Sequence, residues 1–180
     1  DRSLWGLRHL NGLVTLVRSP QPYTFWSQVL TLPFGRVAFA LDISPDGQRL
    51  SASVGEINGS QSVQVFDVQA LIAGQTEPIA RFSMGDSVPE GFVFSPDGRY
   101  LYGSAYYTGV SNIFRFEIAT EELEVVTNAA TGFFRPIPRA DGSLIVFEYT
   151  GQGFQPVVVE PSVRAELGTI RFLGSEVARQ

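Results

Sequence analysis

Three aspartates of the sequence stand in similar short motifs and could act as metal ligands or acid–base groups. Asp46 and Asp97 each belong to a Ser-Pro-Asp-Gly motif, and Asp141 belongs to Arg-Ala-Asp-Gly. Carboxylate oxygens suit calcium and magnesium. The same motifs also suit a tight turn, because proline fixes φ, aspartate bonds to the backbone and glycine accepts positive φ. Turn formation explains every residue of these motifs, so we expect neither a metal nor a cofactor here.

Other motifs that could carry catalysis are incomplete. His9 is the only histidine and there is no cysteine, so a multi-histidine or thiolate zinc site and a supported histidine triad cannot be built. Residues 85–89 approach a nucleophile elbow but end in proline, and residues 151–156 break the glycine pattern of a dinucleotide loop. Asn58-Gly59-Ser60 is formally a glycosylation sequon, but Asn-Gly between two strands is typical of a hairpin turn. We therefore assign no catalytic residue.

Two aromatic clusters are better candidates for a binding surface. Tyr106-Tyr107 and Phe133-Phe134-Arg135 combine residue types that often anchor protein interfaces. Alternation along a strand should bury one ring of each aromatic pair, so packing is the competing role. We select Tyr106, Tyr107, Phe133 and Arg135 as candidate binding residues.

Hairpins are the elements that must position these side chains. The stretch from Phe92 to Tyr102 contains an apolar run, the turn Ser95-Pro96-Asp97-Gly98, and a second apolar run. Two such runs joined by a tight turn predict an antiparallel pair of strands. The stretch is informative because the chain repeats it.

Composition supports a sheet protein and excludes several functions. The chain has 180 residues, enough for one domain with a substantial core, and its 14 Phe and 6 Tyr favour strands. No apolar run approaches the length of a membrane helix, so we expect no direct membrane insertion. The net charge is −5, and the 13 basic residues, all arginine, are scattered singly. Nucleic-acid binding, which needs a basic stripe, is therefore not expected.

Two markers recur with the same register along the chain. Turn glycines stand at 12, 47, 98 and 142, at intervals of 35, 51 and 44 residues. An apolar–polar–apolar strand end follows each turn after about 19 residues, at 30–32, 66–68, 116–118 and 159–161. We predict four repeats, at about 3–36, 37–84, 90–127 and 131–173, within a single domain over 1–180.

Each repeat reads as three or four short strands. The third should have strands at 90–95, 100–107, 112–118 and 122–127, and the second a helical turn within 69–74. The first has no room for an outer strand before the second begins. The fourth has a candidate outer strand at Gly168–Leu173. A period of 40 to 50 residues with four strands per unit is typical of a β-propeller.

Two segments carry a family resemblance. Ser44–Leu50 and Ser95–Leu101, with the strand ends Val65–Val68 and Arg115–Ile118, resemble the WD40-like PD40 repeat of bacterial TolB-type propellers. The resemblance covers about 37–161 and implies an exported protein of the periplasm or cell envelope. It also implies that the propeller binds proteins or accompanies another domain.

We therefore expect an all-β propeller segment of about four blades, the first incomplete, that binds a protein partner and is not an enzyme. One alternative is an enzyme with a metal-assisted site on the propeller axis, using Asp42, Glu90 and Asn128. The other is an accessory domain beside a catalytic neighbour. Residues 1–5 resemble neither a signal peptide nor a translation start, so we expect a segment of a longer chain, able to self-associate through open blade faces.

Overall fold

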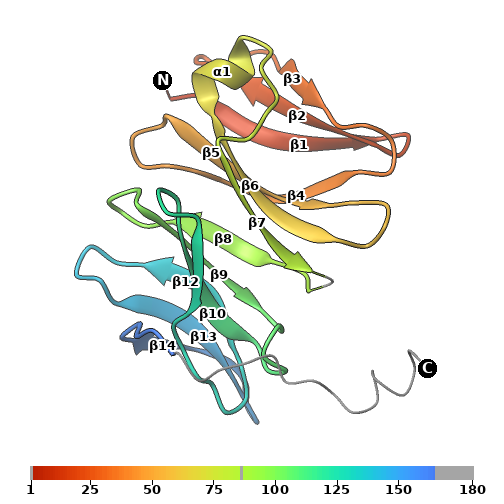
Figure 1. Ribbon diagram of the computed structural model, residues 1–180. Coiled ribbons are helices and arrows are strands. Elements are labelled where there is room, and N and C mark those ends of the chain that lie inside the picture. Colours follow the sequence, from red (N-terminus) through yellow and green to blue (C-terminus); the bar gives the residue numbers. More distant parts are fainter. Residues whose placement is uncertain (1, 86, 165–180) are drawn as a thin grey trace.

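The computed structural model describes residues 2–85 and 87–164. These residues form four antiparallel sheets and one five-residue helix. Sheets I to IV follow one another along the chain, and Figure 1 shows them stacked in the same order.

Sheets I and II come from the first half of the chain. Sheet I has the order β1-β2-β3, with strands at Leu4–Leu10, Leu13–Ser19 and Ser27–Thr31. Sheet II has the order β4-β5-β6-β7, with strands at Val37–Ile43, Arg49–Gly55, Gln61–Asp67 and Ala80–Gly85. The expected helical turn is α1, at Val68–Ile72, whose first turn is capped by the Asp67 carboxylate.

Sheets III and IV come from the second half. Sheet III contains β8 (Glu90–Phe94), β9 (Tyr100–Ala105), β10 (Asn112–Glu117) and β11 (Glu122–Val125) in consecutive order. Sheet IV contains β12 (Phe133–Pro138), β13 (Leu144–Thr150) and β14 (Gly153–Val159). The predicted outer strand of the fourth repeat, Gly168–Leu173, lies outside the described residues.

The aspartate motifs are turns, as the sequence predicts. The Gly98 N–H donates to the Ser95 carbonyl at 2.8 Å, which closes the turn, and Gly98 takes φ of 70°. The Asp97 carboxylate accepts hydrogen bonds from the Ser95 hydroxyl at 2.5 Å and the Arg99 N–H at 3.0 Å. The β4–β5 and β12–β13 turns use Asp46 and Asp141 in related networks.

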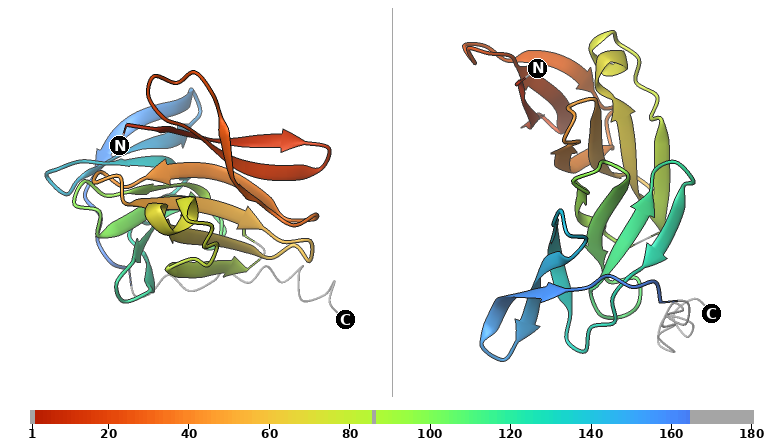
Figure 2. Two further views of the ribbon diagram at one scale, coloured as in Figure 1. Left: turned by 90° about the horizontal axis from the view of Figure 1, so that it is seen from above. Right: turned by 90° about the vertical axis from the view of Figure 1, so that its left-hand side faces the viewer.

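The first strands of sheets II, III and IV lie together on the inner side of the stack. β8 contacts both β4 and β12, while the other strands of each sheet extend outward in sequence order. Figure 2 shows that the stack is curved, with sheet I at one extremity and sheet IV at the other.

Three apolar cores lie between successive sheets. The largest, between sheets II and III, includes Phe116 and Leu101, both fully buried. Full burial of such side chains stabilises the fold by about 2–3 kcal/mol each. Within sheet III, the Phe92 ring of β8 lies over the backbone of β9, so that a Cβ on Gly103 would lie 2.2 Å from it. Glycine is therefore required at this position by packing.

Sheet I is incomplete as expected, but the strand it lacks is not the outer one. A five-residue linker, 32–36, joins β3 to the start of β4, and a Cβ on Gly12 would lie 3.1 Å from the Phe34 ring of that linker. The β1–β2 turn therefore lies at the end of the stack where β4 starts. β1, β2 and β3 thus correspond to β5, β6 and β7, and among the described residues sheet I has no innermost strand. The spacing of the turn glycines aligned Gly12 with the first turn of the other sheets, whereas the turn at Gly12 corresponds to their second. An Asn-Gly turn suits either hairpin, so the motif does not distinguish the two.

Sheet IV has one face packed and one face open. Leu144 and Val146 of β13 point into the core shared with sheet III. The opposite face carries Tyr149, Phe154 and Val158, each more than half exposed. An apolar sheet face of this kind tends to associate.

Replacing Asp97 by alanine should lower the free energy of unfolding by about 1 kcal/mol, the value of one net side-chain hydrogen bond. The Ser95 hydroxyl, then the Arg99 N–H, hold the pKa of Asp97 below its ordinary value. A lowered pKa adds stability above the unfolded pKa of about 3.9, and this is lost as pH falls through the folded pKa. Asp97→Asn should therefore make the acid limb of thermal unfolding shallower. An unchanged acid limb would contradict this account.

The isolated chain should form dimers through its open sheet faces, because burying apolar area is worth about 25 cal/mol per Å². Val158→Glu should shift the mass measured by light scattering after size exclusion toward the monomer. Ile72→Glu, at an exposed apolar residue of α1, is the matched control and should leave the dimer intact. A monomeric wild-type chain would refute the prediction.

Candidate functional site

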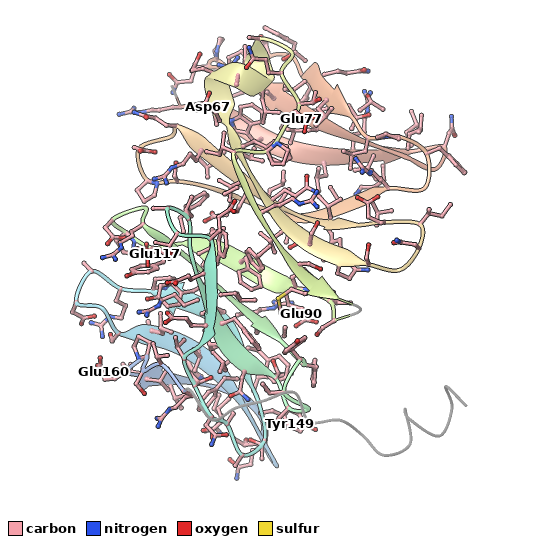
Figure 3. The ribbon with its side chains drawn as sticks, in the orientation of Figure 1. Asp67, Glu77, Glu90, Glu117, Tyr149 and Glu160 are labelled. Atoms are coloured by element: carbon pink, nitrogen blue, oxygen red, sulfur yellow. The ribbon has the colours of Figure 1, made fainter. Side chains whose placement is uncertain are left out.

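The stack of sheets has two chemically different ends. The tyrosine end contains the β1–β2, β5–β6, β9–β10 and β13–β14 turns and the linker residues 32–36, 87–89 and 126–132 between sheets. The aspartate end contains the β4–β5, β8–β9 and β12–β13 turns and the longer β2–β3 loop. In Figure 3, Glu90 and Tyr149 of the tyrosine end lie on the right, and Glu117 and Glu160 of the aspartate end lie on the left.

Every sheet places exposed apolar side chains at the tyrosine end. Phe34 and Ile57 are 78% and 83% exposed, and both pack beside glycine backbone rather than into a core. The whole set comprises Leu10, Leu13, Phe34, Val37, Ile57, Val88, Tyr106, Tyr107, Tyr149 and Phe154. Exposed apolar side chains are not confined to this end, since the β2–β3 loop at the other end exposes Tyr23, Phe25 and Trp26. The tyrosine end differs in that every sheet contributes to it, as expected for an extended interaction surface.

The inner strands share a backbone irregularity near this end. Ala40 in β4, Gly91 in β8 and Arg135 in β12 take positive φ of 55°, 58° and 49°. Each lies where the pairing with the next strand shifts register. All three stand four residues before the tight turn of their sheet. The bulge is therefore a repeated feature of the inner strands.

A groove lies along these bulges. Its larger cavity, of about 630 Å³, is lined by all three inner strands and by Phe147 of β13. A second cavity, of about 480 Å³, shares Glu90, Arg135 and Phe147 with the first and adds Phe134 and Phe154. Both volumes fall in the range of small-ligand sites, roughly 300–1,000 Å³.

Two opposite charges line the groove without partners. Glu90 and Arg135 are exposed, and the side chain of neither forms a hydrogen bond or ion pair with another described residue. Several other arginines form ion pairs with carboxylates, such as Arg36 with Glu56 at 2.7 Å and Arg115 with Glu124 at 2.6 Å. These two charges are thus available to a ligand.

The structure brings together some of the predicted binding residues and separates others. Tyr106 packs edge-on against Phe134 at 5.9 Å between ring centroids, next to Arg135. Tyr107 turns the other way, against Phe114 at 6.2 Å, and Phe133 packs into the core between sheets III and IV. The expectation that one tyrosine of the pair is buried was wrong, because they lie in a loop and are 55% and 47% exposed.

A buried polar network holds the tyrosine loop. The Asn112 amide donates to the Thr108 hydroxyl at 3.0 Å and accepts from the Thr127 hydroxyl and the Ala129 N–H. The Ser111 hydroxyl donates to the Phe133 carbonyl at 2.8 Å. These bonds fix the loop of Tyr106 relative to β12 before any ligand arrives.

The residues of the alternative metal site do not converge. Asp42 accepts a hydrogen bond from the Phe94 N–H at 2.6 Å, which links β4 to β8, and burial raises its pKa. Asn128 is exposed in a linker and lines neither cavity of the groove, while Glu90 does. Within the described residues, no three His, Asp or Glu side chains are placed to hold a metal ion.

Sequence reasoning missed Phe147, Phe154 and the bulges. Phe147 and Phe154 sit in ordinary alternating strands, where the pattern does not say which face is covered. Gly91 within a strand could have indicated the bulge, because glycine in a strand interior often marks one. Ala40 and Arg135 gave no such signal.

The four sheets and their inner strands define a segment of a β-propeller. TolB of Acinetobacter baumannii superposes with a TM-score of 0.65 at 17% identity, over 95% of this chain and 41% of that one. A protein of Agrobacterium tumefaciens assigned as TolB gives 0.59 at 20% identity, over 76% and 51%. An oligogalacturonate lyase in complex with manganese gives 0.63 at 11% identity, over 87% and 46%.

The predicted fold class is therefore confirmed: over its described residues the chain is all-β, with four antiparallel blades, and it is similar to TolB-type propellers. No family model matches the chain. An uncharacterized protein of Agrobacterium fabrum is 33% identical over 85 residues, which is 47% of this chain and 28% of that protein. The chain spans about half or less of each of these proteins. No helix in the described part is long and apolar enough to cross a membrane.

Asp42→Ala should lower the free energy of unfolding by about 1–3 kcal/mol, because the Phe94 N–H loses its acceptor. Asp42→Asn keeps an acceptor and should cost less. The raised pKa of Asp42 stabilises the wild-type fold at low pH, and this contribution is lost as pH rises through the folded pKa. The free energy of unfolding of Asp42→Asn relative to wild type should therefore increase between pH 4 and 7. Urea unfolding at both pH values measures this. An equal loss of unfolding free energy in both variants would show that the hydrogen bond from the Phe94 N–H does not contribute to stability.

Proposed function

We propose that this chain is a non-catalytic, protein-binding segment of a larger β-propeller in an exported bacterial protein of the periplasm or cell envelope. The observation that carries the proposal is the tyrosine end, where every sheet exposes apolar side chains beside a preformed groove. The contact residues would be Tyr106, Tyr107 and Arg135, together with Phe34 and Ile57. Aromatic and arginine side chains of this kind are the usual anchors of interfaces.

The larger propeller is supported by the open face of sheet IV and by the inner strand that sheet I lacks. Further blades would cover both surfaces as the described sheets cover one another, and on sheet IV they would border the groove, because Phe134, Phe147 and Phe154 lie on that open face. The PD40 repeat type and the single domain over 1–180 belong to the same proposal, since the two Ser-Pro-Asp-Gly turns occupy equivalent places in sheets II and III.

A propeller enzyme remains the second candidate, favoured by one observation. The fold is shared with an oligogalacturonate lyase that binds manganese. In this chain, however, Asp42 already bonds to the backbone and Asn128 lies away from the groove, so the oxygen ligands are scattered.

The binding surface can be tested by capture of partners from a bacterial envelope extract. The double variant Tyr106→Ala and Tyr107→Ala should retain at most about a tenth of the partner captured by wild type, since truncating an interface anchor costs 2 kcal/mol or more. Ile72→Ala, which removes an exposed apolar residue of α1 away from this end, should capture as wild type does. If Ile72→Ala loses partner capture and the double variant retains it, the binding surface does not lie at the tyrosine end.

Calorimetric titration with calcium and magnesium separates the two candidates. Scattered carboxylates should bind neither ion more tightly than about millimolar. A one-to-one micromolar site would favour the enzyme instead.

A further inference from the structure

The groove at the tyrosine end combines one acid, one base and an otherwise mostly apolar lining. Glu90 enters it from the start of β8, and Arg135 enters it from the bulge of β12. Among the remaining lining residues are Phe39, Ile137 and Phe147. Such a lining matches a ligand with both charges and an apolar body, because few polar groups orient a ligand while apolar walls bind it.

The backbone bulge of β12 determines where Arg135 lies. At φ of 49° it occupies the left-handed region, which glycine enters without steric cost and arginine does not. The equivalent residue of β8 is Gly91, which takes nearly the same φ. Ala40 of β4 takes the same conformation at φ of 55°, so the bulge belongs to every inner strand, and in β12 it places Arg135 at the groove.

Aromatic rings form one wall of the smaller cavity. Phe134 and Phe154 pack edge-on at 5.2 Å between centroids, and Tyr149 packs against Phe154 at 5.3 Å. Tyr106 supports Phe134 from the other side, held by the Asn112 network. This wall is therefore assembled in the absence of a ligand, which lowers the entropy cost of binding.

We propose that the groove binds short apolar peptides through their free ends. Glu90 pairs with the α-ammonium group, Arg135 pairs with the α-carboxylate, and the phenylalanines hold the side chains. A guanidinium suits the carboxylate because it donates two parallel hydrogen bonds. A cavity of about 630 Å³ holds a dipeptide rather than a folded domain. The inference rests on the proposed function only in placing the binding surface at the tyrosine end.

The test uses the dipeptide Leu-Phe, its N-acetyl form and its C-terminal amide, each titrated into the protein by calorimetry. Each cap should raise Kd at least about tenfold, the loss expected when a charge-assisted hydrogen bond is removed. In Glu90→Gln the acetyl cap should no longer matter, and in Arg135→Gln the amide cap should no longer matter. Arg139→Gln, at an exposed arginine of the aspartate end, is the matched control and should behave as wild type.

Arg135→Gly separates binding from folding. Glycine accepts this φ, so the melting temperature should not fall, while the preference for the free carboxylate should disappear. A Kd that neither cap changes, or no detectable binding at millimolar dipeptide, would overturn the inference. If partner capture still depends on the tyrosine pair in that case, the proposed function stands alone. Cap-dependent dipeptide binding without tyrosine-dependent capture would leave the groove site standing and the proposed function refuted.

Discussion

The middle sheets of this protein are apolar on both faces, and this constraint governs the whole arrangement. Sheet II packs Leu50 and Phe66 against sheet I and Val63 and Val65 against sheet III. A sheet with two apolar faces cannot be stable alone, so stability belongs to the interfaces between neighbours. The curved stack with inner strands at its centre is the consequence.

Polar bonds between sheets then fix how the apolar faces meet. The Asp42 carboxylate holds β8, the Ser53 hydroxyl donates to the Pro89 carbonyl at 3.3 Å, and the Ser111 hydroxyl holds the start of β12. Apolar contact is not directional, whereas each of these bonds specifies one relative position. The groove inherits its shape from them, since its walls belong to three different sheets.

The sequence predicted the strands well because turns and alternation are local. The Ser-Pro-Asp-Gly motifs and the period of about 40 to 50 residues identified sheets II and III and the class of fold. The prediction of which strand sheet I lacks was wrong, because the turn motif at Gly12 does not indicate which pair of strands it joins. Tyr106 and Arg135 were chosen as candidates by residue type alone. Phe147 and Phe154 were not, because only the stacking order decides which face of sheet IV is open.

The repeated bulge also separates two kinds of evolutionary change. An extra residue in one strand of a pair resets the alternation of side chains, so the part before the bulge and the part after it have independent registers. In β12, Phe134 lies before the bulge and Ile137 lies beyond it, and both line the groove. Substitutions that alter the groove can therefore accumulate without shifting the pairing that leads into the turn. The part of the inner strand before the bulge can therefore diversify while the part beyond it keeps its pairing and holds the blade in place.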